Sequence, residues 1–243
     1  MPIFGLKNSV SGLSVSSTSV SRTSDYWIAF DGINDYVSIS SSLNSYFGAK
    51  DWSVSAWIYH SGASGTIFST GHIGSGNAFR FDITSDKLKF YFGQSSGTNV
   101  SATASSGLTD DTWYQVGITH DDSEETVKFY VNGSVTDTFT KNIPGVVHDT
   151  NARIGALAES GSSSELTGKI ANVAVFNDLV TAGEMTNLAS AHSYDATSIG
   201  GCVGWWRMGA GTEAGEGSTI YDMSSNSNNG TLTGGTIESG TIE

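Results

Sequence analysis

The stretch "VKFYVNGSVTDTFT", residues 127–140, alternates apolar and polar side chains on both sides of an Asn-Gly pair. From Val127 to Val131 every second residue is apolar, which places these side chains on one face of an extended strand. Asn132 and Gly133 supply the positive backbone angles that a two-residue turn between antiparallel strands requires. The stretch therefore predicts a β-hairpin with one buried face.

The same alternation recurs on either side of this hairpin. In "DWSVSAWIYH", residues 51–60, Trp52 and Ile58 share one face, while Trp57 and Tyr59 share the other. A second hairpin is expected around a Ser85-Asp86 turn. Its two strands are Phe79–Ile83 and Leu88–Phe92, and two further strands are expected at Tyr114–Thr119 and Lys169–Phe176. Short strands with frequent turn signals predict an all-β fold, an antiparallel β-sandwich.

One short helix interrupts the strands. Thr181 can cap a helix N-terminus, and Glu184, three residues later, can reach back to it as a capping box. Met185 and Leu188 then fall on one face of the helix, which is expected to cover an end of the sandwich. No other segment predicts a helix long enough to connect parallel strands, which argues against an α/β fold.

Composition narrows the class of protein. The chain has 243 residues, a length that all-β sandwiches reach as one domain, and 30 of them are glycine. Its net charge of -13 would repel both a nucleic-acid backbone and an anionic membrane surface, so neither is expected as a partner. Cys202 is the only cysteine, which excludes a disulfide within the chain. The sequence has no apolar run typical of a signal peptide or a membrane span.

Three parts follow from these patterns. Residues 1–24 are rich in serine and threonine and are interpreted as an extended N-terminal arm that either stays mobile or lies along a sheet edge. Residues 25–192 hold the sandwich. Residues 193–243 form a C-terminal strand-and-loop segment that either completes the sandwich or contacts a neighbouring subunit.

This C-terminal segment contains two adjacent tryptophans, Trp205 and Trp206. Successive side chains of a strand point to opposite faces, so the two indoles cannot enter the same core. We expect one of them to pack inside the sandwich and the other to be buried by the arm, the helix or a partner chain. The pair is therefore also a candidate assembly contact.

Five segments together carry a family resemblance. They are "FDGINDYVSI" (30–39), "WSVSAWI" (52–58), "WYQVGITHD" (113–121), "VKFYVNG" (127–133) and "GKIANVAVFNDLVTAGEM" (168–185). In this order they resemble the laminin-G-like jelly rolls of the concanavalin A-like lectin and glucanase superfamily, over about residues 25–192. The resemblance implies two curved antiparallel sheets, one of which holds carbohydrate in some relatives.

The position of the C-terminal segment adds to the resemblance. "GWWR" and the loop after it resemble a piece that precedes the "FDG" strand in many relatives, whereas here it follows the last core strand. That arrangement is similar to jelly-roll structural proteins of marine bacteriophages. It implies a virion protein, a capsid decoration or fibre-like component that assembles as a homo-oligomer with the major capsid or another virion protein. The alternative is a bacterial carbohydrate-binding module or lectin.

Two loops are candidates for calcium, the one cofactor that the sequence suggests. Asp31, Asn34 and Asp35 offer oxygen ligands in a turn between strands, although an ordinary turn explains them as well. Asp222 and Asn226 lie in an oxygen-rich loop that lacks the bidentate carboxylate of a calcium hand, so a self-hydrogen-bonded loop is the favoured interpretation.

The remaining candidates concern carbohydrate and catalysis. Trp57, Tyr59 and Tyr91 lie on strand faces opposite the apolar rows and could contact a glycan, or could pack beneath a loop. The Glu-x-Asp-x-x-Glu strand of the superfamily's glucanases is absent, and the five histidines show no metal-ligand spacing. The sequence therefore predicts a protein without catalytic activity.

Overall fold

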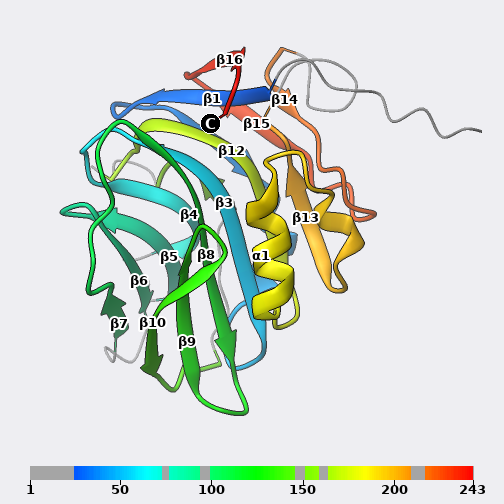
Figure 1. Ribbon diagram of the computed structural model, residues 1–243. Helices are drawn as coiled ribbons and strands as arrows, with labels where there is room; N and C mark the ends of the chain where they lie inside the picture. Colours follow the sequence, from blue (N-terminus) through cyan, green and yellow to red (C-terminus); the bar gives the residue numbers. More distant parts are fainter. Residues whose placement is uncertain are drawn as a thin grey trace, which may run out of the picture.

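Two antiparallel sheets pack face to face around one core, and the α-helix α1 (Ala182–Ser190) lies on the outside of one sheet (Figure 1). The structure is a computed structural model that describes residues 25–72, 77–93, 99–145, 151–158, 164–208 and 217–242. The predicted all-β antiparallel sandwich is confirmed. The predicted arm, residues 1–24, lies outside the described residues. No helix in the described ranges combines the length and the apolar character that crossing a bilayer requires.

Sheet A contains eight strands. In spatial order they are β10 (Ser134–Thr140), β9 (Thr126–Val131), β8 (Thr112–Asp121), β3 (Trp52–His60), β12 (Thr167–Phe176), β1 (Asp25–Asp31) and β16 (Thr236–Gly240), and β13 (Cys202–Trp206) also pairs with β12. The long strand β12 pairs with β1 through its first half and with β13 through its second half. An irregularity between Ala171 and Ala174, with Asn172 at a positive φ of 47°, separates the two halves.

Sheet B also contains eight strands. Their spatial order is β14 (Thr219–Ile220), β15 (Gly230–Thr233), β2 (Tyr36–Ile39), β11 (Ala152–Ile154), β4 (Gly65–His72), β5 (Asn77–Thr84), β6 (Lys87–Gly93) and β7 (Val100–Thr103). Two short 3-10 helices, η1 (Ser41–Tyr46) and η3 (Ala196–Ser198), complete the described elements.

The turn residues behave as the sequence predicts. Asn132 and Gly133 adopt φ values of 49° and 74° between β9 and β10, and Ser85 and Asp86 adopt 49° and 64° between β5 and β6. The capping box of α1 is present, because the Glu184 backbone N–H donates to the Thr181 hydroxyl while the Glu184 carboxylate accepts from the Thr181 N–H. Both hairpins and the helix start are therefore confirmed.

The C-terminal segment adds strands to both sheets of the same chain. β13 and β16 join sheet A, β14 and β15 join sheet B, and β16 lies along β1 near the start of the described chain (Figure 1). Of the two alternatives for residues 193–243, this is the one in which the segment completes the sandwich. The apolar side chains of both sheets meet between them, and the largest fully buried ones include Trp52, Trp206 and Phe79.

Candidate functional site

The outward face of sheet A carries four large aromatic side chains around one lysine. Trp113 of β8, Tyr59 of β3 and Lys169 of β12 lie side by side, because they are register partners in neighbouring strands. Trp27 and Trp57 lie beside them in a small cluster separate from the main core. The ring of Trp113 contacts those of Trp27 and Tyr59 edge to face, with 5.6 Å between centroids in each pair. We call these five residues the aromatic platform.

The charges on the aromatic platform are balanced. Lys169 Nζ lies 4.8 Å from the Trp27 ring centroid and 5.7 Å from that of Tyr59. It donates to Glu238 Oε2 over 2.9 Å, and the same oxygen accepts from the Trp27 indole N–H over 2.7 Å. These two hydrogen bonds lower the pKa of Glu238, so its carboxylate stays ionised opposite the ammonium. The platform is therefore apolar with one neutralised ion pair, inside a strongly acidic protein.

Three rings of the platform are only partly buried: Trp57, Tyr59 and Trp113. Trp57 is anchored to the helix region, since its indole N–H donates to the Leu188 carbonyl over 3.2 Å. The Tyr59 hydroxyl donates to Asp111 Oδ1 over 3.4 Å at the rim of the sheet. These hydrogen bonds fix the rings and leave part of each one accessible.

The three predicted glycan-contacting residues do not form one site. Trp57 and Tyr59 come together in the aromatic platform. Tyr91 lies on the outward face of sheet B, where it is the register partner of Arg80. Alternation along a strand placed all three side chains outside the core correctly, but it does not say to which sheet a strand belongs. Trp113 and Trp27, which complete the platform, were not among the predicted residues.

The adjacent tryptophans divide between two clusters. Trp206 is fully buried in the main core, and a Cβ at Gly204 would overlap its ring. Trp205 is 6% exposed on the outward face of sheet A, among residues that include Met185 and Leu188 of α1. Its indole N–H donates to Asn172 Oδ1. The second indole is therefore buried in a cluster formed by α1 and the segment after it, and both rings are buried without a partner chain.

In the first calcium candidate, the turn with Asp31, Asn34 and Asp35, both carboxylates accept hydrogen bonds from backbone N–H groups. Asp35 is 4% exposed and accepts the N–H groups of Asp31 and Gly235, and Asp31 Oδ1 accepts the N–H of Ile33. Asn34 is exposed in the same turn. Carboxylates that bind backbone donors hold a turn together, as the ordinary-turn interpretation predicts.

The second calcium candidate shows the same kind of bonding. The Asp222 carboxylate accepts the backbone N–H groups of Trp205, Ser224 and Asn228 and the Ser224 hydroxyl. Asn226 donates its side-chain amide to the Val203 carbonyl. This loop therefore docks onto β13 through Asp222, in agreement with the self-hydrogen-bonded alternative.

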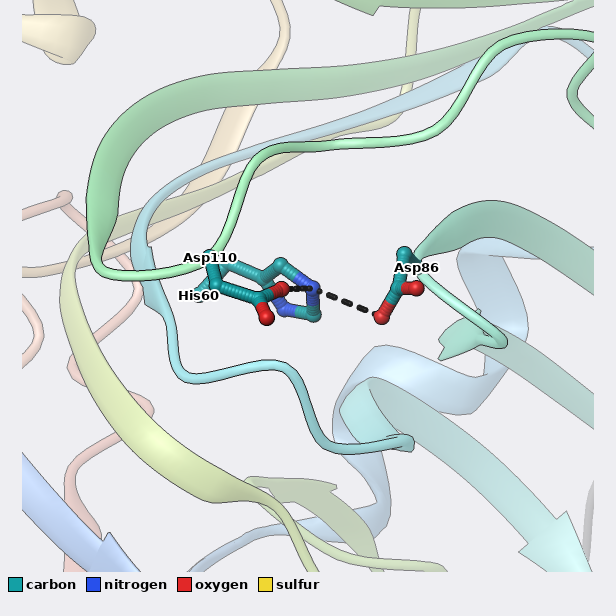
Figure 2. Close-up of side chains that lie close together, drawn as sticks. All are labelled: His60, Asp86 and Asp110. Atoms are coloured by element: carbon teal, nitrogen blue, oxygen red, sulfur yellow. Dashed lines mark hydrogen bonds and ion pairs between the residues drawn. The ribbon is translucent and has the colours of Figure 1, made fainter.

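Sequence patterns missed a cluster at the end of the sandwich. His60, the last residue of β3, has a fully buried side chain, and its Nε2 lies 3.1 Å from Asp86 Oδ1 and 3.5 Å from Asp110 Oδ1 (Figure 2). Asp86 belongs to the β5–β6 turn and Asp110 to the loop before β8. The three residues come from separate elements, so no local spacing could reveal them.

Comparisons with known proteins agree with the fold. The chain is similar to a candidate carbohydrate-binding protein from Bacteroides ovatus (20% identity, 88% of this chain and 59% of that one, TM-score 0.68). It is also similar to the CBM40 of the Ruminococcus gnavus IT-sialidase, solved with α2,3-sialyllactose (14% identity, 67% and 97% covered, TM-score 0.55). Domains LG4-5 of the mouse laminin α1 chain match as well (16% identity, 65% and 43% covered, TM-score 0.50).

These similarities show a shared fold, and the chain spans 59% of the length of the Bacteroides protein. No curated protein matches the sequence. The family model of the concanavalin A-like lectin/glucanases superfamily matches residues 31–186, which include most of both sheets and the first half of α1. Because that match covers more than half of the sequence, the chain belongs to the concanavalin A-like lectin/glucanases superfamily.

Proposed function

We propose that the chain is a non-catalytic carbohydrate-binding jelly roll whose aromatic platform contacts the sugar. The observation that carries this proposal is the gathering of Trp57, Tyr59 and Trp113, all partly exposed, on one sheet face outside the main core. The Bacteroides ovatus protein and the sialyllactose-bound CBM40, both similar in fold, support a carbohydrate as the ligand class.

The chemistry of the platform suits a sugar. The C–H faces of a pyranose are apolar and pack against aromatic rings, while its hydroxyls need donors and acceptors at the edge of the contact. Glu238, Lys169 and Asp111 provide carboxylate and ammonium groups beside the rings. Since Lys169 and Glu238 neutralise each other, a neutral sugar is the ligand that the platform favours.

The same geometry argues against hydrolysis at this face. A glycosidase needs a carboxylic acid that is protonated at working pH opposite a second carboxylate. The pKa of Glu238 is lowered by its hydrogen bonds with Lys169 and Trp27, which is the wrong direction for a general acid. We therefore include the absence of catalysis in the proposal.

Two tyrosines on opposite sheets give a matched test of the proposal. Tyr59→Ala removes a ring from the platform, and Tyr91→Ala removes an equally large, partly buried ring from sheet B. We expect a panel of immobilised neutral polysaccharides to include one that retards the wild-type chain, and Tyr59→Ala to elute early from it while Tyr91→Ala behaves as wild type. Failure of every polysaccharide to retard the wild type, or equal loss in the two variants, would contradict the assignment.

We also propose, as the biological setting, a bacteriophage virion in which the jelly roll is a capsid decoration or fibre-like component. In support, β13 to β16 follow the last core strand and complete the sandwich, the arrangement whose sequence resembles marine phage structural proteins. In this setting the protein would be a homo-oligomer bound to the major capsid or another virion protein, assembled in the host cytoplasm. Mass spectrometry of purified particles should find it at high copy number; its absence from them would leave the free carbohydrate-binding module as the setting.

A further inference from the structure

His60, Asp86 and Asp110 converge from three separate elements at the end of the sandwich (Figure 2). One ligand atom from each, the imidazole Nε2 and two carboxylate oxygens, lies within 4.8 Å of the others. We propose that these three side chains bind one divalent transition-metal ion, for which Zn²⁺ is the probe. This site is separate from the two loops considered for calcium, and the proposal does not depend on carbohydrate binding.

The spacing of the ligand atoms fits a small metal ion. Nitrogen and oxygen ligands at their usual distances from zinc occupy corners of a tetrahedron whose edges are roughly 3.3–3.6 Å long. His60 Nε2 lies 3.1 Å from Asp86 Oδ1 and 3.5 Å from Asp110 Oδ1. The two carboxylate oxygens lie within 4.8 Å of each other, so movement of the two exposed side chains toward each other would bring all three atoms to one ion.

The histidine is held in the orientation that a ligand needs. Its side chain is fully buried, and Nε2 faces both carboxylates, whereas the buried Nδ1 has no hydrogen-bond partner among the described residues. A backbone hydrogen bond also holds the end of β3 against the loop that carries Asp110, because the Asp111 N–H donates to the His60 carbonyl over 2.7 Å. The imidazole therefore directs one nitrogen to the cluster, where a metal ion and a proton would compete for the same lone pair.

The two carboxylates are accessible, and no lysine or arginine of the described residues forms a salt bridge with them. Asp86 and Asp110 side chains are 47% and 63% exposed, and within the described ranges the salt bridges of both are to His60 alone. Lys87, adjacent to Asp86, donates instead to the Ser105 carbonyl. In a chain with a net charge of -13, a cation held between these carboxylates would relieve their repulsion.

A glycine makes room for one of the ligands. Gly62 has a φ of +81°, and a Cβ there would lie 2.8 Å from Asp110 Oδ2 and 3.1 Å from Oδ1. The Asp110 carboxylate therefore lies directly against the backbone at Gly62, on the side facing His60. A side chain at position 62 would crowd this carboxylate and force it to move.

The ligand set indicates the class of ion. Imidazole nitrogen is a preferred ligand of zinc, copper, nickel and iron, while calcium takes six to eight oxygens. One imidazole and two carboxylates match sites with three protein ligands, where water or another small ligand completes the coordination. We therefore expect Zn²⁺ to bind much more tightly than Ca²⁺.

Isothermal titration of the full, untagged chain with ZnCl₂ tests the proposal. We expect one saturable equivalent and a higher melting temperature with Zn²⁺, and visible absorption bands of bound Co²⁺ as an independent sign of coordination. Asp110→Asn keeps the shape of an exposed side chain and should weaken Zn²⁺ binding by at least the roughly tenfold that loss of an outer-sphere partner costs at other sites. Asp86→Asn should do the same.

Asp122→Asn is the matched control, because it removes one negative charge from an exposed acidic turn elsewhere in the chain. It should bind Zn²⁺ as the wild type does. The proposal is overturned if the wild type shows no saturable binding, or if Asp110→Asn and Asp86→Asn bind as tightly as Asp122→Asn. Melting of each variant without metal shows that it is folded, so that weakened binding reports on the ligands alone.

Discussion

The outward face of sheet A carries tryptophans on two halves that differ in what covers them. On the half next to β13, Trp205 is 6% exposed in a cluster that includes Leu188 of α1 and Ala196 and Ile199 from the segment after it. On the half next to β1, Trp57 and Trp113 keep part of their surface accessible. β12 runs through both halves, with its irregularity at Asn172 between them.

The difference shows that an outward-facing indole can serve either stability or ligand binding, depending on what covers it. Where other residues of the chain cover it, the indole contributes to stability like a core residue, because its apolar area is removed from water. Where nothing in the described chain covers it fully, the same side chain is available to a ligand. Substitutions on the two halves should therefore affect different properties.

The largest expected effect is on stability, from a substitution on the half of sheet A that carries Trp205. Trp205→Ala should lower the free energy of unfolding by about 3–5 kcal/mol, because it leaves a cavity in the cluster that buries this indole. Trp113→Ala, on the open half, should lower it by much less. Urea denaturation at constant pH measures both. Similar losses for the two variants would mean that the halves do not differ in the way proposed.

A covered charge on sheet B should also act through stability. Burial raises the pKa of Asp82 to about 6, although Arg80 Nη2 lies 2.8 Å from its carboxylate and opposes the shift. Because the unfolded chain releases this proton near pH 4 and the folded chain near pH 6, this group makes stability fall as the pH rises between those values, by on the order of 2 kcal/mol.

Asp82→Asn isolates this contribution from the other carboxylates. Urea denaturation of wild type and variant at pH 4 and pH 7 should show that the difference between their stabilities changes with pH in the stated direction. A difference that is the same at both pH values would show that Asp82 titrates normally.

On the open half, the expected effect is on binding. Trp113→Ala should weaken glycan binding at least tenfold, about 1.4 kcal/mol, since its ring is in edge-to-face contact with both Trp27 and Tyr59. Affinity electrophoresis in gels that contain the polysaccharide that retards the wild-type chain gives the dissociation constants of the wild type and of Trp113→Ala. Trp205→Ala, if still folded at the assay temperature, is the control and should keep wild-type affinity.

The smallest expected effect is a loss of stability caused by weakening α1. Thr181→Ala removes the N-cap of α1 and should cost about 1 kcal/mol of stability. Glycan affinity should be unchanged. The indole N–H of Trp57 is bonded to the Leu188 carbonyl near the end of α1, whereas Thr181 lies at its start. Thermal unfolding with and without the polysaccharide separates the two effects. A loss of affinity in a stable, folded variant would tie the platform to the helix more closely than its other contacts indicate.

Much of the fold was predictable because it is encoded locally. Asn132 and Gly133 define one hairpin, and Thr181 and Glu184 define the start of the helix. Alternation also requires Trp205 and Trp206 to point to opposite faces. The sequence could not decide between the arm, the helix and a partner chain as the cover of Trp205, because that depends on contacts between distant segments.

The candidate sites were less predictable for the same reason. Alternation placed Trp57, Tyr59 and Tyr91 outside the core, but strand order puts Tyr91 on the other sheet. Trp27 joins the platform only because β1 pairs with β12. His60 forms a cluster with Asp86 and Asp110 through tertiary folding alone, so the absence of metal-ligand spacing among the histidines was no guide to it.

The six tryptophans allow one direct test of the distinction between open and covered indoles. Each gives one indole N–H signal in a ¹H–¹⁵N correlation spectrum. Trp57 and Trp113 are partly exposed on the platform, Trp27 is buried within it, and Trp52, Trp205 and Trp206 are buried elsewhere. Titration with oligosaccharides of the polysaccharide that retards the wild-type chain should shift the signals of Trp57 and Trp113 and leave those of Trp52, Trp205 and Trp206 in place. Shifts confined to Trp52, Trp205 and Trp206, or binding with no indole shift at all, would contradict the assignment of the site to the open half of sheet A.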